Sequence, residues 1–244
     1  MKVWSYLVDL IAPMRCPFCD RFIRWDKLFC SVCLKRLPFT GSEVCRACGK
    51  VDCICKFTDN EDSIQKRIYP HYDRCIVPLY YDDIVKHSII DMKYNSCGVN
   101  SKAIAEIITR RLKKCSNDNS LLVCVPMTRK AKIARGYNQS HLISKNLSSF
   151  LGIEYDPRVL RKNRNTKDQK TLTKHERALH FLDAFTVAQH EKVMNRDILL
   201  CDDVLTTGNT LNECARVLKL AGARTVTAVV FATVKGAQDN ENEV

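Results

Sequence analysis

The stretch from Ile198 to Ala223, ILLCDDVLTTGNTLNECARVLKLAGA, constrains the fold of this chain more than any other. Its first apolar residues, 198–200, predict a fully buried central strand. Asp202 and Asp203 follow and place two negative charges at the C-terminal end of that strand, where ligands bind in open α/β sheets. The order of strand, acidic pair, loop and helix therefore predicts an α/β protein with a ligand site at this edge of its sheet.

A loop rich in hydroxyl groups separates the acidic pair from a helix predicted at about 211–221. Backbone N–H groups, hydroxyls and the positive end of the helix dipole would converge there, which suits a phosphate. The two carboxylates suit vicinal hydroxyls or a magnesium ion instead. Together these groups predict a sugar-phosphate site, and the alternative is a solvated strand end followed by an ordinary capped helix. The loop residues are Thr206, Thr207, Gly208, Asn209 and Thr210.

This stretch closely resembles the signature of type I phosphoribosyltransferases, which bind phosphoribosyl pyrophosphate (PRPP) together with magnesium. The resemblance implies that Asp202 and Asp203 contact the 2′- and 3′-hydroxyls of the ribose. It also implies that the loop from Thr206 to Thr210 holds the 5′-phosphate.

The composition is that of a soluble protein with a strongly basic balance. At 244 residues the chain suits one ordinary domain plus a small one, and 45% hydrophobic residues support a real core. No apolar run approaches the ~18 residues of a membrane span, and residues 1–16 lack a convincing signal-peptide core. We therefore expect an N-terminal packing helix and a cytoplasmic protein. The net charge of +12 favours phosphate-bearing partners, from PRPP to a nucleic acid backbone.

Cysteines gather at the front of the chain, where eight of the 14 occur. Two C-x2-C turns can bring four thiolates around one tetrahedral metal ion. The alternatives are disulfides, which fit an intracellular chain poorly, and unrelated buried thiols. We expect one or two structural zinc ions that supply much of the folding energy of this segment. The predicted ligands are Cys16, Cys19, Cys30 and Cys33 for the first ion, and Cys45, Cys48, Cys53 and Cys55 for the second.

Basic and aromatic residues alternate through the same segment, a pattern that suits contact with single-stranded nucleic acid. The alternative is that the aromatic rings pack internally and the charges face water. The aromatic residues are Phe18, Phe22, Trp25 and Phe29, and the basic residues are Arg15, Arg21, Arg24, Lys27, Lys35 and Arg36.

Strands and helices alternate through the rest of the chain, which predicts a parallel sheet with right-handed crossovers. The predicted strands are 76–81, 121–125, 198–201 and 225–231, and the predicted helices are 84–92, 101–114, 139–150 and 211–221.

Two further segments carry chemistry-bearing residues. Residues 125–140, VPMTRKAKIARGYNQS, follow a strand end, so their cations could neutralise a pyrophosphate or form a solvated basic turn. Residues 161–185 begin with a long polar, basic, glycine-free stretch, which predicts either a lid over an anionic ligand or plain flexible surface. The cations of the first segment are Arg129, Lys130, Lys132 and Arg135.

The order of these motifs resembles the ComF family along nearly the whole chain. Cysteine knuckles are followed by V-P-x-x…R-G-Y-N-Q, then by R-N-T-K-D-Q-K-x-L-x-x-x-E-R…A-F, and then by the PRPP signature. The family joins a zinc-ribbon-like module to a type I phosphoribosyltransferase-like domain, a parallel sheet flanked by helices. The run from Thr58 to about Lys66 is polar and acidic, which predicts a linker. We therefore expect a zinc-ribbon-like module at 1–57, a linker at 58–70 and a phosphoribosyltransferase-like domain at 71–244.

The resemblance also assigns residues to roles. It implies that Arg129 and Lys130 belong to a pyrophosphate loop, and that Arg135 opens the R-G-Y-N-Q motif that ends at Gln139. His180 departs from the family, where an Asn is usual, and we expect an altered loop contact there. The flexible-loop motif is filled by Arg164, Thr166, Gln169, Leu172 and Arg177.

Members of the family are associated with natural competence, the import of single-stranded DNA. The resemblance therefore implies a PRPP-binding protein that assists the handling of incoming DNA with the import machinery. The alternatives are an active phosphoribosyltransferase with an unknown acceptor and a PRPP-sensing regulator. Thr206 stands where the hypoxanthine-guanine branch has an Asp that acts as a base, so 6-oxopurine chemistry is disfavoured. The sequence indicates neither the acceptor nor the oligomeric state.

Overall fold

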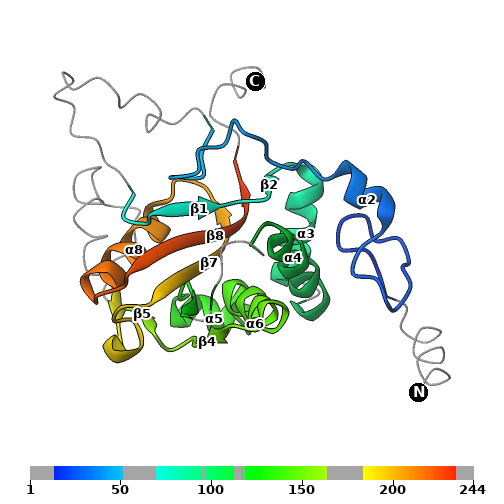
Figure 1. The fold of residues 1–244 in the computed structure, drawn as a ribbon. Coiled ribbons are helices and arrows are strands. Elements are labelled where there is room, and N and C mark those ends of the chain that lie inside the picture. The colour runs from blue at the N-terminus through cyan, green and yellow to red at the C-terminus, as the bar shows by residue number, and fades with distance from the viewer. Residues whose placement is uncertain are drawn as a thin grey trace, which may run out of the picture.

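The computed structural model describes residues 14–51, 70–94, 97–112, 117, 119–163 and 184–234 (Figure 1). In chain order its elements are α2 (Ser31–Arg36), β1 (Arg74–Ile76), β2 (Leu79–Tyr80), α3 (Asp83–Tyr94), α4 (Cys97–Leu112), β3 (Ser120–Cys124), α5 (Arg129–Arg135), α6 (Gln139–Leu151), β4 (Glu154–Tyr155), β5 (Leu160–Lys162), β6 (Phe185–Val187), the 3₁₀ helix η3 (His190–Lys192), β7 (Asp197–Leu205), α8 (Asn209–Leu220) and β8 (Thr225–Thr233).

A parallel sheet forms the centre of the molecule. Its strands follow the order β1-β8-β7-β3-β4, and β2 also pairs with β8. The strands β3, β7 and β8 lie in the middle, with Val123 opposite Leu200 and Leu200 opposite Ala228. Parallel strands need crossover connections, and the intervening helices provide them. The predicted fold class, a parallel sheet flanked by helices, is confirmed.

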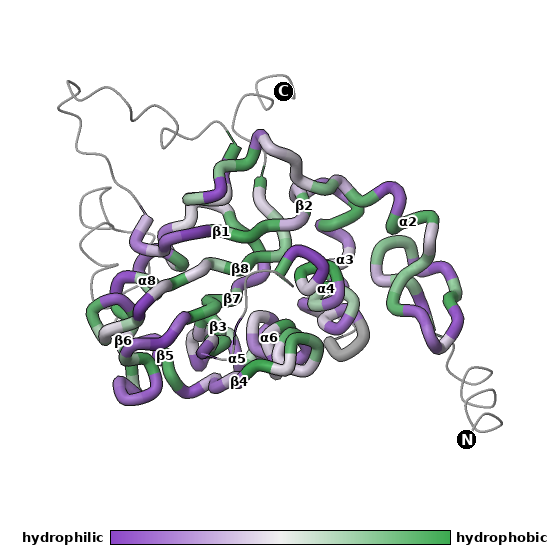
Figure 2. The backbone as a smooth tube through the Cα atoms, viewed as in Figure 1, coloured by the Kyte–Doolittle hydropathy of each residue, from purple (hydrophilic) through white to green (hydrophobic). Residues whose placement is uncertain are grey.

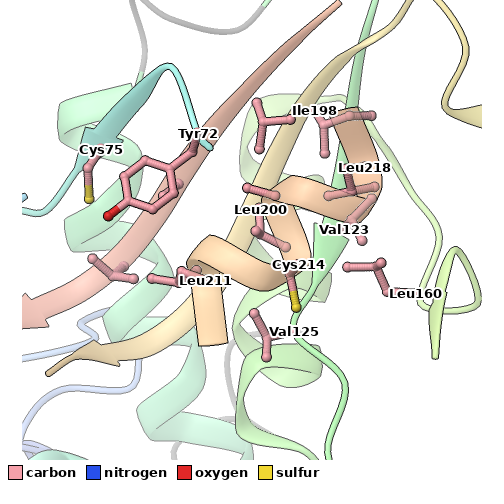
Figure 3. Packing of buried hydrophobic residues seen from close by; sticks show 14 of the residues in the cluster. Tyr72, Cys75, Val123, Val125, Leu160, Ile198, Leu200, Leu211, Cys214 and Leu218 are labelled. Carbon is pink, nitrogen blue, oxygen red and sulfur yellow. The ribbon is translucent and has the colours of Figure 1, made fainter. Parts of the chain in front are cut away.

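Both faces of the sheet are apolar, as expected for parallel strands covered by helices. Along β7, Ile198 and Leu200 join a cluster with α8, whereas Leu199 and Cys201 join a second cluster with α3, α4 and α6. Figure 3 shows the first cluster, in which Leu211, Cys214 and Leu218 of α8 point toward the strands. This alternation of neighbouring side chains between faces explains the continuous apolar run in the sequence.

The helices form one layer on each side of the sheet. On one side α4 packs against both α3 and α6, and α8 lies on the other side (Figure 1). Each of these helices carries both hydrophobic and hydrophilic stretches (Figure 2), which is typical of helices that bury one face. Within the described ranges, no helix combines the length and the hydropathy needed to cross a bilayer.

The cysteine-rich segment follows the edge of the sheet next to β2. Phe39 forms an antiparallel bridge with Leu79, and the N–H of Tyr80 donates to the carbonyl of Pro38 at 2.8 Å. The N–H of Thr40 donates to the carbonyl of Pro78 at 2.9 Å, and its hydroxyl donates to the carbonyl of Val77 at 2.7 Å. Residues 38–40 therefore satisfy backbone groups that an edge strand would otherwise expose.

Three details differ from the sequence-based expectation. The strand predicted at 76–81 is divided into β1 and β2 by Pro78, which has no N–H to donate to a ladder. The strand predicted to end at Cys201 continues to Leu205, because Asp202 and Val204 stay in register with Val230 and Ala232. The basic segment after β3 contains the helix α5, and the short strands β4, β5 and β6 had no clear signal.

Candidate functional site

The acidic pair lies inside β7 rather than beyond its end. The hydroxyl of Ser140, in the first turn of α6, donates to Asp202 Oδ1 at 2.8 Å, and the N–H of Asp203 donates to the same oxygen at 3.0 Å. The N–H of Val204 donates to Asp203 Oδ1 at 2.7 Å. These bonds fix both carboxylates, and within the described ranges no hydrogen bond occupies Asp202 Oδ2.

Charge repulsion and burial act together on this pair. Burial, followed by the neighbouring charge of Asp203, raises the pKa of Asp202 to about 7. The ammonium group of Lys93, near the end of α3, lies 3.2 Å from Asp203 Oδ2 and partly offsets the negative charge. A site that raises the pKa of a carboxyl in this way is stabilised by a cation, and carboxylate oxygens are the ligands that magnesium prefers.

The loop after β7 is built to present backbone N–H groups. Gly208 has φ +81°, a left-handed conformation that glycine adopts without strain, and it caps α8. The N–H of Asn209 donates to the hydroxyl of Thr207 at 3.4 Å. Among the described residues, no acceptor meets the N–H groups of Gly208 and Thr210. The start of α8 can therefore offer unpaired donors and a positive dipole end to an anion.

The basic segment lies at the same edge of the sheet. The strands β3 and β7 are neighbours, and the N–H of Val125 donates to the carbonyl of Cys201 at 2.9 Å. Thr128 caps α5 by accepting from the N–H of Ala131, so Arg129 and Lys130 occupy its exposed first turn. The structure thus brings these cations to the edge that carries the acidic pair, although no contact joins the two groups in the described part of the chain.

The R-G-Y-N-Q motif holds α5, α6 and α3 together. Gly136 ends α5 in the left-handed conformation, and Asn138 caps α6 while its side chain donates to the carbonyl of Val125 at 2.9 Å. The hydroxyl of Tyr137 donates to the carbonyl of Met92 in α3. Arg135 was predicted to bind PRPP. Its Nη1 donates to Gln139 Oε1 at 3.5 Å, so its side chain contacts another residue of the same motif. These residues position Ser140 and Lys93 around the acidic pair.

The predicted flexible-loop residues Arg164, Thr166, Gln169, Arg177 and His180 lie outside the described residues. The two strands that border the segment, β5 and β6, pair antiparallel, with Lys162 opposite Phe185.

Four of the predicted metal ligands form a cluster. The sulfur atoms of Cys16, Cys19, Cys30 and Cys33 all lie within 4.8 Å of one another. The distance of 3.8 Å between Cys19 Sγ and Cys30 Sγ is about the edge of a tetrahedron with zinc–sulfur bonds of ~2.3 Å. The N–H groups of Cys30 and Cys33 donate to sulfur, at 3.4 Å to Cys16 and at 3.3 Å to Cys30. The thiols therefore fit a closed, structural metal site.

The second group of cysteines is described only in part. Cys45 and Cys48 are buried, whereas Cys53 and Cys55 lie outside the described residues. The turn that contains the buried pair, 45–50, contacts the loop after β7, because Lys50 Nζ donates to the carbonyl of Thr207 at 2.6 Å. The cysteine-rich segment therefore extends to the candidate site.

The aromatic residues of this segment fall into two groups. Phe18 and Phe29 pack edge to face with ring centroids 6.3 Å apart, as the packing alternative expects. Phe22 and Trp25 are exposed by 63% and 50%, and the guanidinium of Arg15 lies 4.3 Å from the centroid of the Phe22 ring. Two of the four rings are therefore exposed at the surface, and Arg15 lies over one of them.

Comparison with known proteins identifies the two parts of the chain. Residues 100–243 match the phosphoribosyl transferase domain, and residues 7–76 match the double zinc ribbon domain. The chain belongs to the phosphoribosyl transferase domain family. In front of this domain the chain carries the zinc ribbon that the resemblance to the ComF family implied.

Its relatives have names connected with DNA. The chain is 27% identical over 216 residues to the DNA utilization protein YhgH of Escherichia coli strain K12, covering 86% of each protein. It is 25% identical to competence protein F of Haemophilus influenzae, covering 64% of this chain and 71% of that protein. It is 24% identical to competence protein ComFC of Bacillus subtilis, covering 85% of this chain and 90% of that protein. The resemblance to the ComF family is confirmed.

Three contributors to the site carried no signal of their own in the sequence. Ser140 was visible only as the end of a basic segment, and Lys93 only as one lysine in a helix. Lys50 lies 157 residues from its partner in the chain. The N-cap asparagine before Ser140 was the one available pointer, since it places that serine in the first turn of a helix.

Proposed function

We propose that this chain binds PRPP with magnesium at the edge formed by β3 and β7, and that it assists the handling of single-stranded DNA in natural competence. The observation that carries the first part is the pairing of two fixed carboxylates with unpaired N–H groups at the start of α8. The carboxylates suit the ribose hydroxyls and the metal, and the N–H groups suit the 5′-phosphate.

Calorimetric titration with PRPP, with and without magnesium chloride, tests this proposal. We expect binding that requires magnesium, and a loss of at least 100-fold in affinity when Asp202→Asn and Asp203→Asn are combined. The matched control is Asp26→Asn, an exposed acid of the cysteine-rich segment. An unchanged affinity in the double variant would rule out the acidic pair as the sugar site.

The second part of the proposal rests on the names of the relatives, on the net charge of +12 and on the exposed rings of Phe22 and Trp25. Bases stack on exposed aromatic rings, each stack contributing about 1–3 kcal/mol, and cations neutralise the phosphates. The zinc ions of the double ribbon would hold these rings in place without taking part in chemistry, the first through the four clustered thiols and a second through Cys45 and Cys48 with Cys53 and Cys55.

Fluorescence anisotropy with labelled single-stranded oligonucleotides tests the DNA contact. We expect an affinity that falls steeply with salt, and a loss of roughly tenfold for Phe22→Ala with Trp25→Ala. Phe150→Ala, which changes a ring in α6, serves as the control. Equal affinity of the double variant and the parent would remove the DNA contact from this surface.

A cavity favours a second function, phosphoribosyl transfer to an acceptor. It has a volume of about 540 Å³ beside α5, and its walls include Pro126, Met127, Tyr137 and His141. Burial lowers the pKa of His141, so the imidazole is neutral at neutral pH. Its Nδ1 lies 2.6 Å from the hydroxyl oxygen of Tyr155. In the transfer, the acceptor would form a bond to C1 of the ribose while the bond to pyrophosphate breaks. A neutral imidazole in the cavity could take the proton of the acceptor.

Pyrophosphate release across a panel of bases and amines decides between the two functions. Release that depends on one acceptor, and that is lost in His141→Phe while PRPP still binds, would establish the transferase. Binding without release for any acceptor would leave the chain a PRPP-binding protein.

A further inference from the structure

We infer that Lys50 of the cysteine-rich segment is a positioning residue for the phosphate loop: it holds the peptide between Thr207 and Gly208 so that its N–H faces the ligand. This inference rests on the proposed function for the identity of the ligand. Its starting observation is the bond of 2.6 Å from Lys50 Nζ to the carbonyl of Thr207.

The orientation of the peptide between Thr207 and Gly208 follows from its trans geometry. No cis peptide bond occurs among the described residues, so the carbonyl of Thr207 and the N–H of Gly208 point in opposite directions. Lys50 holds the carbonyl from one side, and the N–H is therefore turned to the other. Among the described residues nothing accepts that N–H.

The positive charge of Lys50 strengthens the N–H of Gly208 as a donor. A cation that binds a carbonyl polarises the whole peptide unit and makes its N–H a stronger donor. The contact is charge-assisted, and such bonds are stronger than bonds between neutral groups. Lys50 therefore acts on an anion at this loop through the peptide, without contacting the anion itself.

The turn that carries Lys50 is fixed in place. The N–H of Cys45 donates to the carbonyl of Lys50 at 3.0 Å, and the N–H of Gly49 donates to the carbonyl of Cys45 at 2.8 Å. Gly49 has φ +74°, and a Cβ there would lie 2.4 Å from Cys75 Sγ and 2.8 Å from Leu205 Cδ2. The turn is thus packed directly against β1 and against the residue that precedes the loop.

A second contact ties the same turn to the loop. The hydroxyl of Tyr72 donates to the carbonyl of Cys48 at 3.1 Å, and its oxygen lies 3.8 Å from the position of a Cβ on Gly208. Lys50 Cε lies 3.7 Å from that position. The cysteine-rich segment therefore packs behind the phosphate loop. This contact gives a physical reason why the segment and the domain occur in one chain.

The test compares Lys50→Met and Lys50→Arg with the parent protein, and uses Lys102→Met, an exposed lysine of α4, as the matched control. Two quantities are measured: the affinity for PRPP with magnesium by calorimetry, and the amide signal of Gly208 by ¹⁵N–¹H NMR in the free protein. Metal content and melting temperature are checked in every variant.

We expect Lys50→Met to weaken PRPP binding about tenfold and to shift the Gly208 signal, with unchanged metal content. Lys50→Arg should recover part of both, and Lys102→Met should change neither. Either an unshifted Gly208 signal or an unchanged affinity overturns the inference. If the parent protein does not bind PRPP, the proposed function fails. The Gly208 signal still shows whether Lys50 fixes the orientation of the peptide between Thr207 and Gly208.

Discussion

The four-thiol cluster and the acidic pair of β7 are both concentrations of potential negative charge, but their surroundings differ. The thiols of Cys16 and Cys33 are buried and point to a common centre, with N–H groups directed at sulfur. The carboxylates of Asp202 and Asp203 have one hydroxyl, two backbone donors and Lys93, and the pKa of Asp202 is still raised. The first cluster suits permanent closure by a structural metal, whereas under the proposed function the second is relieved by a ligand that binds reversibly.

The two clusters should therefore respond to substitution with opposite signs. Removing a thiol should destabilise the protein, whereas removing a carboxylate should stabilise it at the expense of binding. Active and binding sites commonly show such a conflict between stability and function.

The largest effect is expected from Cys16→Ser. Structural zinc sites contribute about 10–16 kcal/mol in small domains, so loss of one ligand should remove the metal and several kcal/mol of stability. Metal analysis and thermal melting measure both quantities. Cys124→Ala, which removes a buried thiol outside the cluster, should keep the parent's metal content. A Cys16→Ser protein as heat-stable as the parent would contradict a structural metal.

The opposite sign is expected from Asp202→Asn. The pKa of this carboxyl is raised from 3.8 to about 7 in the folded protein, so the unfolded chain loses its proton first and folding is opposed as the pH rises through that range. The variant should exceed the parent by up to about 4 kcal/mol at pH 8 and match it near pH 3. Urea unfolding at the two pH values measures this, and a variant less stable than the parent at pH 8 would show that the pair is not strained.

A smaller effect is expected from Ser140→Ala. The hydroxyl stabilises the charged form of Asp202, so its loss should raise the pKa of that carboxyl further and cost about 1 kcal/mol at pH 8. The loss should vanish in an Asp202→Ala background, which has no side-chain acceptor at this position, and a double-mutant cycle measures this. Equal losses in both backgrounds would mean that the serine acts elsewhere.

The smallest effect is expected from Lys93→Met. The lysine and Asp203 are partly exposed, so the ion pair should contribute only about 0.5 kcal/mol. Millimolar magnesium should reduce the difference between variant and parent, because either cation neutralises the pair. Melting curves with and without magnesium test this, and Lys86→Met on the same helix is the control. A difference that magnesium leaves unchanged would separate Lys93 from the metal site.

The sequence predicted the parts of the site that are contiguous in the chain. The buried strand, the acidic pair and the loop occur within one stretch, so a local pattern of residue types predicted them as a candidate site. The thiol cluster could be predicted equally well from the sequence, because C-x2-C spacing is a local property.

The sequence could not predict the parts that tertiary packing assembles. Lys50 and Lys93 reach the site from separate elements, and no local pattern distinguishes them from other lysines. The helix α5 was missed because its charges suggested a loop, although Thr128 and Gly136 are suitable caps at its two ends. The strands β5 and β6 are three residues each, too short to show an alternating pattern.

The pairing of residues 38–40 with β2 has a practical consequence for anyone who shortens this protein. The strands β1 and β2 form the rim of the sheet, and the bridge from Phe39 to Leu79 shields part of it. A chain trimmed to begin after residue 45 would uncover unpaired amide and carbonyl groups beside the apolar Leu79, a template for self-association. Aggregation of such a fragment would then result from the uncovered edge of the sheet and not from low stability of the remaining domain.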